Sequence, residues 1–385
     1  MTAGRMKGYG YMRDLGRQAG RPLFRADHVG SLLRPSAVRA GFRQLNEGQI
    51  TADEYRQVQD EAIGHVVKLQ EEAGLKSITD GEFRRASYWS HFVEAVDGLT
   101  VKPAVYVFRD EHDHEQSFLA PHVNGRVQRT RPISGHEFDF LQATTSQTPK
   151  LTLPSPPTMH FWRGREAIEP GVYESRVAYF ADLAQVYQAE IADLAARGAT
   201  YLQIDEVPLA MLCDPQVRGV VQATDDDPAQ LIDDYVNLLN EAVAQRPSHL
   251  TIAMHLCRGN YKAHWLSTGG YDFIAGRLFN EINVDVYFLE YDTPRAGDFT
   301  PLQHVPSHKG IVLGLVSSKT PALETADSLR RRLDEASQFI DLSQVGISPQ
   351  CGFASTVAGN PLTEDDERRK LELIVNVANQ VWGDD

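Results

Sequence analysis

Cysteine is scarce in this chain, and long apolar runs are missing. Only three cysteines, Cys213, Cys257 and Cys351, occur among 385 residues. Three thiols cannot build a disulfide framework, so the sequence predicts a protein of a reducing compartment such as the cytoplasm. No apolar run approaches the ~18 residues that a membrane-spanning helix needs, so we expect no membrane partner.

Positive charge is also in short supply. The 38 Lys and Arg residues are outnumbered by 52 Asp and Glu residues, which gives a formal net charge of −14. This balance argues against nucleic acid or an anionic membrane surface as a partner. Residues 1–21 are rich in basic residues and glycine and have no apolar core, so we expect a flexible leader rather than a signal peptide. We expect residues 22–385 to form a single domain. The sequence leaves the oligomeric state open.

Helical and strand-like patterns alternate along the rest of the chain. Residues 51–73 begin with the pair Thr51 and Glu54, which is typical of a capping box, and keep apolar residues at helical spacing. Similar helical patterns cover residues 174–197, 228–244, 325–340 and 363–382. Short apolar runs that end in polar residues lie between them, at 26–31, 77–82, 201–206, 250–255, 287–291, 310–317 and 345–350. An eighth run, 150–157, contains prolines that suit only the edge or end of a strand.

Eight strands that alternate with helices predict an α/β fold, the (β/α)8 or TIM barrel. A doubly wound sheet is the alternative, but no glycine-rich phosphate loop follows the first strand. We interpret residues 88–148, which show no clear period, as an insertion between strands 2 and 3 that covers part of the catalytic face. Polar residues fall at the carboxyl ends of the predicted strands, where such barrels place their active sites: Ser31, Glu82, Asp205, His255, Glu290, Ser318 and Cys351.

Four of these side chains are of the types that bind zinc. His255 and Cys257 are two residues apart on one predicted strand, so they point to the same side of the sheet. Glu290 and Cys351 follow two other strands. One imidazole, two thiolates and a carboxylate would make a four-ligand zinc site. Each residue alone has a plainer interpretation, because buried cysteines are often small apolar residues and a strand-end acid often caps a helix.

Together these motifs resemble the cobalamin-independent methionine synthase family. The resemblance runs from about residue 24 to 382, and it is to short members with a single catalytic barrel. It implies that His255, Cys257, Glu290 and Cys351 bind zinc, and that the segment with His28, Gly30 and Ser31 holds a thiol amino acid. It also implies that Glu82 and Asp205 receive the amino group of that substrate. From the sequence alone, both acids could instead cap the helices that follow them.

Two segments depart from the family pattern. Lys319, in Ser317-Ser318-Lys319-Thr320-Pro321, stands where the family has a histidine that protonates the leaving group. Arg131-Pro132 is only a loose match to the segment that binds folate. Lys319 is therefore a candidate acid, a helix-end cation or a contact for a substrate anion, and the methyl donor is left open.

The resemblance implies a zinc-dependent methyltransferase that acts on homocysteine or a related small thiol, with a folate or another methyl or alkyl donor. An alternative is alkyl transfer to another thiol, as in epoxide:coenzyme M transferase-type lyases. Hydrolases or decarboxylases related to uroporphyrinogen decarboxylase share the barrel but lack this zinc set, and a purely structural zinc site is a further alternative. The acids Glu82 and Asp205 favour an amino-acid thiol, because a sulfonate-bearing thiol needs cations. The aromatic residues Tyr88 and Trp89, and Trp162 after the third strand, are candidates for the wall of the pocket. Cys213 is expected to be structural.

Overall fold

The computed structural model describes residues 20–106, 108–109, 115–116, 118–260, 264–357 and 359–383. Apart from Gly20 and Arg21, the leader expected at 1–21 lies outside the described residues. In the described part of the chain, every helix is too short or too polar to cross a membrane.

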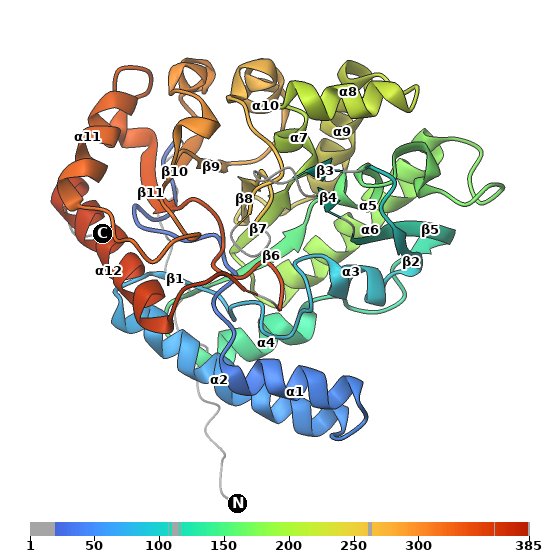
Figure 1. Ribbon diagram of the computed structural model, residues 1–385, viewed down its shortest axis with the longest axis horizontal. Helices are drawn as coiled ribbons and strands as arrows, with labels where there is room; N and C mark the ends of the chain where they lie inside the picture. Colours follow the sequence, from blue (N-terminus) through green and yellow to red (C-terminus); the bar gives the residue numbers. More distant parts are fainter. Residues whose placement is uncertain are drawn as a thin grey trace, which may run out of the picture.

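A curled parallel sheet forms the centre of the molecule, and helices surround it (Figure 1). Its seven strands lie side by side in the order β1-β6-β7-β8-β9-β10-β11. Their bounds are Ser77–Ile78 for β1, Thr148–Pro154 for β6, Tyr201–Glu206 for β7, Thr251–Leu256 for β8, Val286–Glu290 for β9, Gly310–Val316 for β10 and Val345–Pro349 for β11. The predicted α/β barrel is therefore confirmed, and the proline-containing run 150–157 corresponds to a full strand, β6.

The first predicted strand, 26–31, is not a regular strand in the structure. The segment nevertheless lies between β11 and β1, the two edge strands of the sheet, where an eighth strand would complete the barrel. Ala26 forms a single parallel bridge with Ile347 of β11. On the other side, the Thr79 hydroxyl donates to the Gly30 carbonyl at 2.6 Å, just beyond β1. Gly30 has a φ of 136°, which no regular strand permits.

The second predicted strand, 77–82, is also shorter than expected. It is regular only at Ser77–Ile78, because Gly81 and Glu82 adopt φ values of 68° and 61°. A positive φ is uncommon for a residue other than glycine, and it turns the Glu82 side chain away from the direction that an extended strand would give it.

The helices follow the predicted pattern closely. Helix α2 (Ala52–Glu72) begins at Thr51 with the expected capping box to Glu54. The other predicted helices are α6 (Arg176–Ala196), α9 (Pro228–Val243), α11 (Ala326–Ala336) and α12 (Glu364–Trp382). Shorter helices complete the outer layer: α1 (Ser36–Asn46), α5 (Thr158–Phe161), α7 (Pro208–Met211), α8 (Pro215–Ala223) and α10 (Ala275–Glu281). Single 3-10 turns lie at Gly164–Ala167, Tyr271–Phe273, Pro294–Ala296, Thr300–His304 and Leu342–Gln344.

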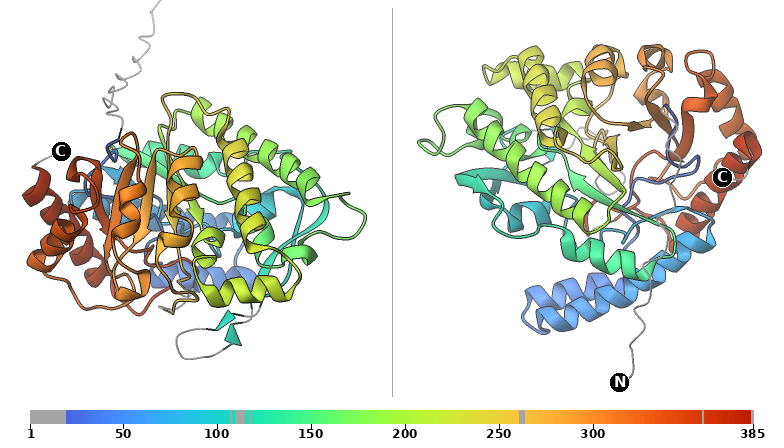
Figure 2. Two further views of the ribbon diagram at one scale, coloured as in Figure 1. Left: turned by 90° about the horizontal axis from the view of Figure 1, so that it is seen from above. Right: turned by 180° about the vertical axis from the view of Figure 1, so that it is seen from behind.

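The insertion predicted between the second and third strands lies between β1 and β6. It contains α3 (Ser90–Ala95), α4 (Gly135–Thr144), the antiparallel pair β2 (Asp97–Pro103) and β5 (Leu119–Gln128), and the small pair β3 (Phe108–Arg109) and β4 (Glu115–Gln116). In all views the β2–β5 ribbon lies on the side of the barrel opposite α11 and α12 (Figures 1 and 2).

Strand alternation divides the core into an interior and an outer layer. Alternate residues of the strands, among them Tyr201, Ala253 and Phe288, form one buried cluster inside the curled sheet. Their neighbours Leu202, Ile252 and many others pack against the helices in a larger cluster. Because side chains alternate along a strand, residues an even number of positions from the interior residues also point inward. The polar side chains of Asp205, His255 and Glu290, near the ends of β7, β8 and β9, therefore point into the barrel.

Candidate metal centre and substrate cavity

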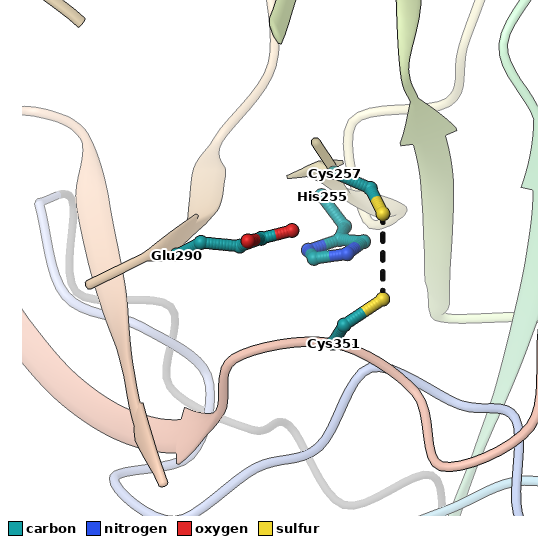
Figure 3. A group of neighbouring side chains, drawn as sticks. All are labelled: His255, Cys257, Glu290 and Cys351. Atoms are coloured by element: carbon teal, nitrogen blue, oxygen red, sulfur yellow. Dashed lines mark hydrogen bonds between the residues drawn. The ribbon is translucent and has the colours of Figure 1, made fainter. Parts of the chain in front are cut away.

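The four predicted metal-binding side chains meet at the carboxyl ends of β8, β9 and β11. Their donor atoms, one each from His255, Cys257, Glu290 and Cys351, all lie within 4.8 Å of one another (Figure 3). His255 and Cys257 share the inward parity of Ala253, and Glu290 shares that of Phe288. Cys351 comes two residues after the end of β11. The sequence prediction that strand ends bring these four residues together is therefore confirmed.

The two thiols of this cluster are in direct contact. The Sγ atoms of Cys257 and Cys351 lie 3.4 Å apart. The hydrogen bond from Cys257, together with His255, holds the pKa of the Cys351 thiol well below its usual range. A cysteine with a depressed pKa is already close to the thiolate form that a metal requires.

The donor set fits zinc on two independent observations. Both ring nitrogens of His255 are buried and make no hydrogen bond of ordinary geometry with the described residues. A buried imidazole without a partner is costly, and a metal ion would satisfy it. Two sulfurs, one nitrogen and one carboxylate oxygen are also the ligand types of zinc rather than of magnesium or calcium.

Glu290 differs from the other three donors because protein cations surround it. Its Oε1 accepts a hydrogen bond of 2.9 Å from the peptide N–H of Arg258, and its Oε2 lies 3.1 Å from the guanidinium of Arg295. Burial alone would raise the pKa of Glu290, but the charges of Lys319, Arg295 and Arg258 lower it to about 2. Glu290 is therefore ionised at any ordinary pH.

A cavity of about 390 Å³ opens beside the metal centre. His255, Cys257 and Cys351 line it, whereas Glu290 is fully buried behind them and does not. The wall away from the metal is apolar and largely aromatic. It is made by Tyr88, Trp89, Phe118, Leu119, Trp162 and Leu266. The aromatic residues expected at the pocket therefore do line it, and Phe118 and Leu119 of the insertion complete the wall.

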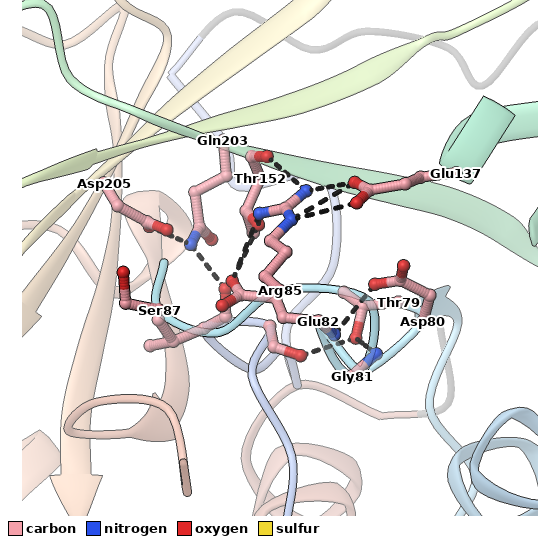
Figure 4. Close-up of polar contacts among 12 residues, drawn as sticks. Thr79, Asp80, Gly81, Glu82, Arg85, Ser87, Glu137, Thr152, Gln203 and Asp205 are labelled. Carbon is pink, nitrogen blue, oxygen red and sulfur yellow. Dashed lines mark hydrogen bonds and ion pairs between the residues drawn. The ribbon is translucent and has the colours of Figure 1, made fainter. Parts of the chain in front are cut away.

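Two carboxylates, Glu82 and Asp205, lie on the floor of this cavity (Figure 4). Asp205 accepts a hydrogen bond of 2.8 Å from Gln203. Burial, and secondly the negative charge of Glu82, raises the pKa of Asp205 to about 7. The Oε1 of Glu82 accepts a hydrogen bond of 2.7 Å from Thr152, while its buried Oε2 has no partner among the described residues.

The nearest cation does not satisfy this acidic pair. Arg85 approaches Glu82 at 3.7 Å, but its guanidinium is committed to Glu137 at 2.6 Å. The two other acids at these strand ends, Asp80 and Glu206, do not line the cavity. Glu206 instead accepts a hydrogen bond from the N–H of Leu209 at the start of α7. The acidic pair therefore faces the cavity with spare capacity for a positively charged group.

Of the other predicted site residues in the segment 28–31, only Ser31 lines the cavity. Gly30 lies just behind, where a Cβ atom would come within 2.7 Å of Thr152 and 3.7 Å of Glu82. His28 is buried, does not line the cavity, and has its pKa lowered to about 3 by burial. Cys213 is buried away from the cavity, and burial raises the pKa of its thiol to about 11, as befits a structural cysteine.

Lys319 does not line the cavity. It is only 8% exposed, and its buried Nζ makes no hydrogen bond with the described residues. Its positive charge instead lowers the pKa of Glu290, and it also acts on Cys257 and Asp292. Lys319 therefore stands behind the metal centre, on the side of Glu290.

Sequence reasoning missed the cations around Glu290. Arg258 follows Cys257 directly, and Arg295 lies five residues after Glu290 in an irregular loop. No periodicity marks either residue, so only the folded loop shows that they meet the carboxylate. The proximity of Arg258 to two predicted ligands was the one available signal.

Comparisons with known proteins agree with this geometry. A family model described as "Cobalamin-independent synthase, Catalytic domain" matches residues 24–380. The chain belongs to this family. The uncharacterized protein YxjH of Bacillus subtilis (strain 168) is 39% identical over 362 residues, which cover 93% of this chain and 95% of that protein.

Two further relatives carry names that refer to methionine synthesis. A methionine synthase of Pyrococcus abyssi is 24% identical over 333 residues, covering 86% of this chain and 87% of that protein. A solved structure from Listeria monocytogenes, provisionally named a vitamin-B12 independent methionine synthase, superposes with a TM-score of 0.75 at 33% identity. That superposition covers 96% of this chain and 100% of the other. Family membership supports a methyltransferase with a barrel fold.

Proposed function

We propose that this protein is a zinc-dependent methyltransferase that methylates the thiol of homocysteine or of a closely related amino-acid thiol. One observation carries the proposal: three of the four metal donors, His255, Cys257 and Cys351, face the same cavity as the acidic pair. A site that joins a thiol-activating metal to an ammonium-binding pair suits a substrate that has both groups.

His255, Cys257, Cys351 and Glu290 would hold the zinc, which when bound would keep the sulfur of the acceptor as a thiolate at neutral pH. The other steps belong to the chain. The acidic pair, Glu82 and Asp205, receives the substrate ammonium group and fixes the sulfur at the metal end of the cavity. Such positioning converts an encounter between two molecules into a reaction within one complex.

The acidic pair also distinguishes the candidate thiols. An ammonium group would offset the charge of Asp205, whose pKa is raised by burial and by the charge of Glu82. A sulfonate-bearing thiol would instead place an anion against Glu82 and Asp205, which is unfavourable in a buried site. The chemistry of the cavity floor therefore favours an amino-acid thiol over coenzyme M-like thiols.

The methyl donor would occupy the aromatic part of the cavity. No Lys or Arg is found among the described residues that line it. A donor with several carboxylates, such as a polyglutamylated methyl-folate, would therefore find no partner for its charges there. We propose a donor whose methyl-bearing end is planar or apolar, and we expect polyglutamylated methyl-folate to be a poor one.

The direct test is to incubate purified, zinc-loaded protein with homocysteine and a panel of methyl donors, and to measure methionine by mass spectrometry. The panel should include methyl-folates with one and three glutamates, a sulfonium donor and a methyl-cobalamin donor. Methionine formation with any donor, lost in a Cys257→Ser variant, supports the proposal. If methylated product forms only when homocysteine is replaced by a thiol without an amino group, the assignment of the acceptor is wrong.

A further inference from the structure

The acidic pair is bordered by a buried ion pair that lies outside the cavity. Arg85 comes three residues after Glu82, and its side chain is fully buried. Two of its nitrogens donate to Oε2 of Glu137, Nη2 at 2.6 Å and Nε at 3.2 Å (Figure 4). The approach of Arg85 to Glu82 is longer, at 3.7 Å. Arg85 is therefore paired with Glu137 rather than with the carboxylate that faces the cavity.

Glu137 is well suited to hold this cation. It lies in the first turn of α4, where the helix dipole favours a negative charge. Burial would raise the pKa of Glu137, but the charge and the hydrogen bonds of Arg85 outweigh burial, and the pKa falls to about 2. Glu137 is therefore ionised at neutral pH and binds Arg85 as a full anion.

Thr152 of β6 lies between Arg85 and Glu82. Its hydroxyl accepts a hydrogen bond of 2.8 Å from Nη1 of Arg85 and donates one of 2.7 Å to Oε1 of Glu82. Nη2 of Arg85 also donates to the carbonyl of Thr152, at 2.9 Å. Arg85 is thus linked to Glu82 through a neutral hydroxyl, while the buried Oε2 of Glu82 has no partner among the described residues.

The backbone that carries Glu82 and Arg85 is fixed by a second arginine. Arg34 donates to the carbonyls of both residues, at 2.9 Å each, and to the carbonyl of Ala354 at 2.7 Å. An exchange of partners at Arg85 therefore needs only a rotation of its side chain, because the turn 82–85 can stay in place.

A buried guanidinium requires a carboxylate partner. It keeps its proton in proteins, and an unpaired charge in a buried site is strongly unfavourable. Apart from Glu137, Glu82 is the only carboxylate in the described part of the chain that forms an ion pair with Arg85. Without the charge of Glu137, Arg85 would therefore turn to Glu82. Glu82 would then have less negative charge to offer an ammonium group in the cavity.

We propose that Glu137 is a specificity-determining residue, because by holding Arg85 it leaves Glu82 available to the amino group of the substrate. Neither Glu137 nor Arg85 lines the cavity, so Glu137 is a positioning residue that acts through Arg85. The inference rests on the proposed function, since it assumes a thiol substrate that has an amino group. It gives the insertion, which contains α4, a part in the choice of the acceptor.

The test compares two thiols that differ only in the amino group. Calorimetry on the zinc-loaded protein measures the affinities for homocysteine and for 4-mercaptobutanoate, which is homocysteine without its amino group. We expect Glu137→Gln to lower the ratio of these affinities on the order of tenfold, because Arg85 then competes with the ammonium group for Glu82. The affinity for 4-mercaptobutanoate should barely change.

Two further variants separate this role from a structural one. The double variant Arg85→Met/Glu137→Gln has the same net charge as the wild type and no cation that could turn to Glu82. It should restore the ratio to at least the wild-type value. Glu137→Asp keeps the charge on a shorter side chain, so it should lower the ratio less than Glu137→Gln does.

The matched control is Glu190→Gln. Glu190 is also a buried acid, which pairs with Arg129 at 2.7 Å and accepts the N–H of Ser134, just before α4, at 2.7 Å. This change affects the same insertion without touching Arg85, so the ratio should stay at the wild-type value. Circular dichroism and metal analysis check that each variant is folded and contains zinc.

An unchanged ratio in Glu137→Gln would overturn the inference, whether both affinities fall together or neither falls. A ratio that stays equally low in the double variant would also overturn it, because the loss would then not pass through Arg85. Failure of the proposed function gives a different result. In that case the wild-type protein itself would bind homocysteine no better than 4-mercaptobutanoate.

Discussion

Two buried carboxylates at strand ends of the same sheet have opposite electrostatic settings. Glu290 at the end of β9 is surrounded by cations, and its pKa falls to about 2. Asp205 near the end of β7 forms no salt bridge with the described residues, and burial together with the charge of Glu82 raises its pKa to about 7. Strand β8, which carries His255, lies between them.

The difference suits the two carboxylates to different tasks. Glu290 is ionised and held in place by protein partners, which suits a metal ligand. Asp205 accepts a hydrogen bond from Gln203 but forms no ion pair with the described residues, which suits a group that binds a charged ligand. Burial acts to raise the pKa of both carboxyls, so the neighbouring charges account for the opposite directions of their shifts.

The largest effect should come from removing a sulfur from the metal centre. We expect Cys257→Ser and Cys351→Ser each to lose nearly all bound zinc, because a hydroxyl is a far weaker zinc ligand than a thiolate. Cys213→Ser is the matched control and should keep its zinc, since Cys213 lies outside the cluster. Metal analysis of the purified proteins measures this, and full zinc content in both ligand variants would contradict the assignment.

Neutralising the acidic pair should have an intermediate effect, confined to substrates with an amino group. We expect Glu82→Gln and Asp205→Asn each to weaken homocysteine binding by about 1–3 kcal/mol while zinc is retained. Binding of 4-mercaptobutanoate, which is homocysteine without its amino group, should barely change. Calorimetry measures both affinities. Equal losses for the two thiols would mean that the carboxylates have only a structural role.

The raised pKa of Asp205 predicts a pH dependence with a definite sign. Below pH 7 the carboxyl is mostly protonated and neutral, so an ammonium group gains less by binding beside it. The affinity for homocysteine relative to 4-mercaptobutanoate should therefore rise between pH 6 and pH 8, by at most about tenfold. Asp205→Asn should flatten this ratio. A ratio that falls as the pH rises would show that Asp205 does not receive the amino group.

The smallest effect concerns the tail of the donor. Because the described residues of the cavity wall include no Lys or Arg, extra glutamates on methyl-folate should not raise kcat/KM by more than about threefold. Lys319→His should likewise leave the preference between donors unchanged, since Lys319 does not line the cavity. Steady-state rates with one and three glutamates decide this, and rapid turnover favouring three glutamates would refute it.

The sequence predicted the regular secondary structure better than the irregular segments. The strand 251–256 could be predicted together with the shared direction of His255 and Cys257, because side chains alternate along a strand. The capping box at Thr51 could be predicted because it is a local sequence motif. The segment 26–31 was predicted as a strand, but the backbone at Gly30 prevents it.

The residues that surround the metal donors and the cavity were harder to predict from the sequence. Arg295 reaches Glu290 through an irregular loop, and the insertion brings Phe118 and Leu119 to the cavity by long-range packing. Residue identity carries no signal for such contacts. The sequence therefore predicts which atoms could bind a metal, and the fold determines which charges control them.

X-ray absorption at the zinc edge, on the purified protein with and without homocysteine, tests the central claim most directly. The account predicts two sulfurs, one imidazole nitrogen and one oxygen around zinc in the free protein. With homocysteine it predicts a third sulfur around zinc. Zinc surrounded by the same ligands before and after homocysteine is added would contradict it.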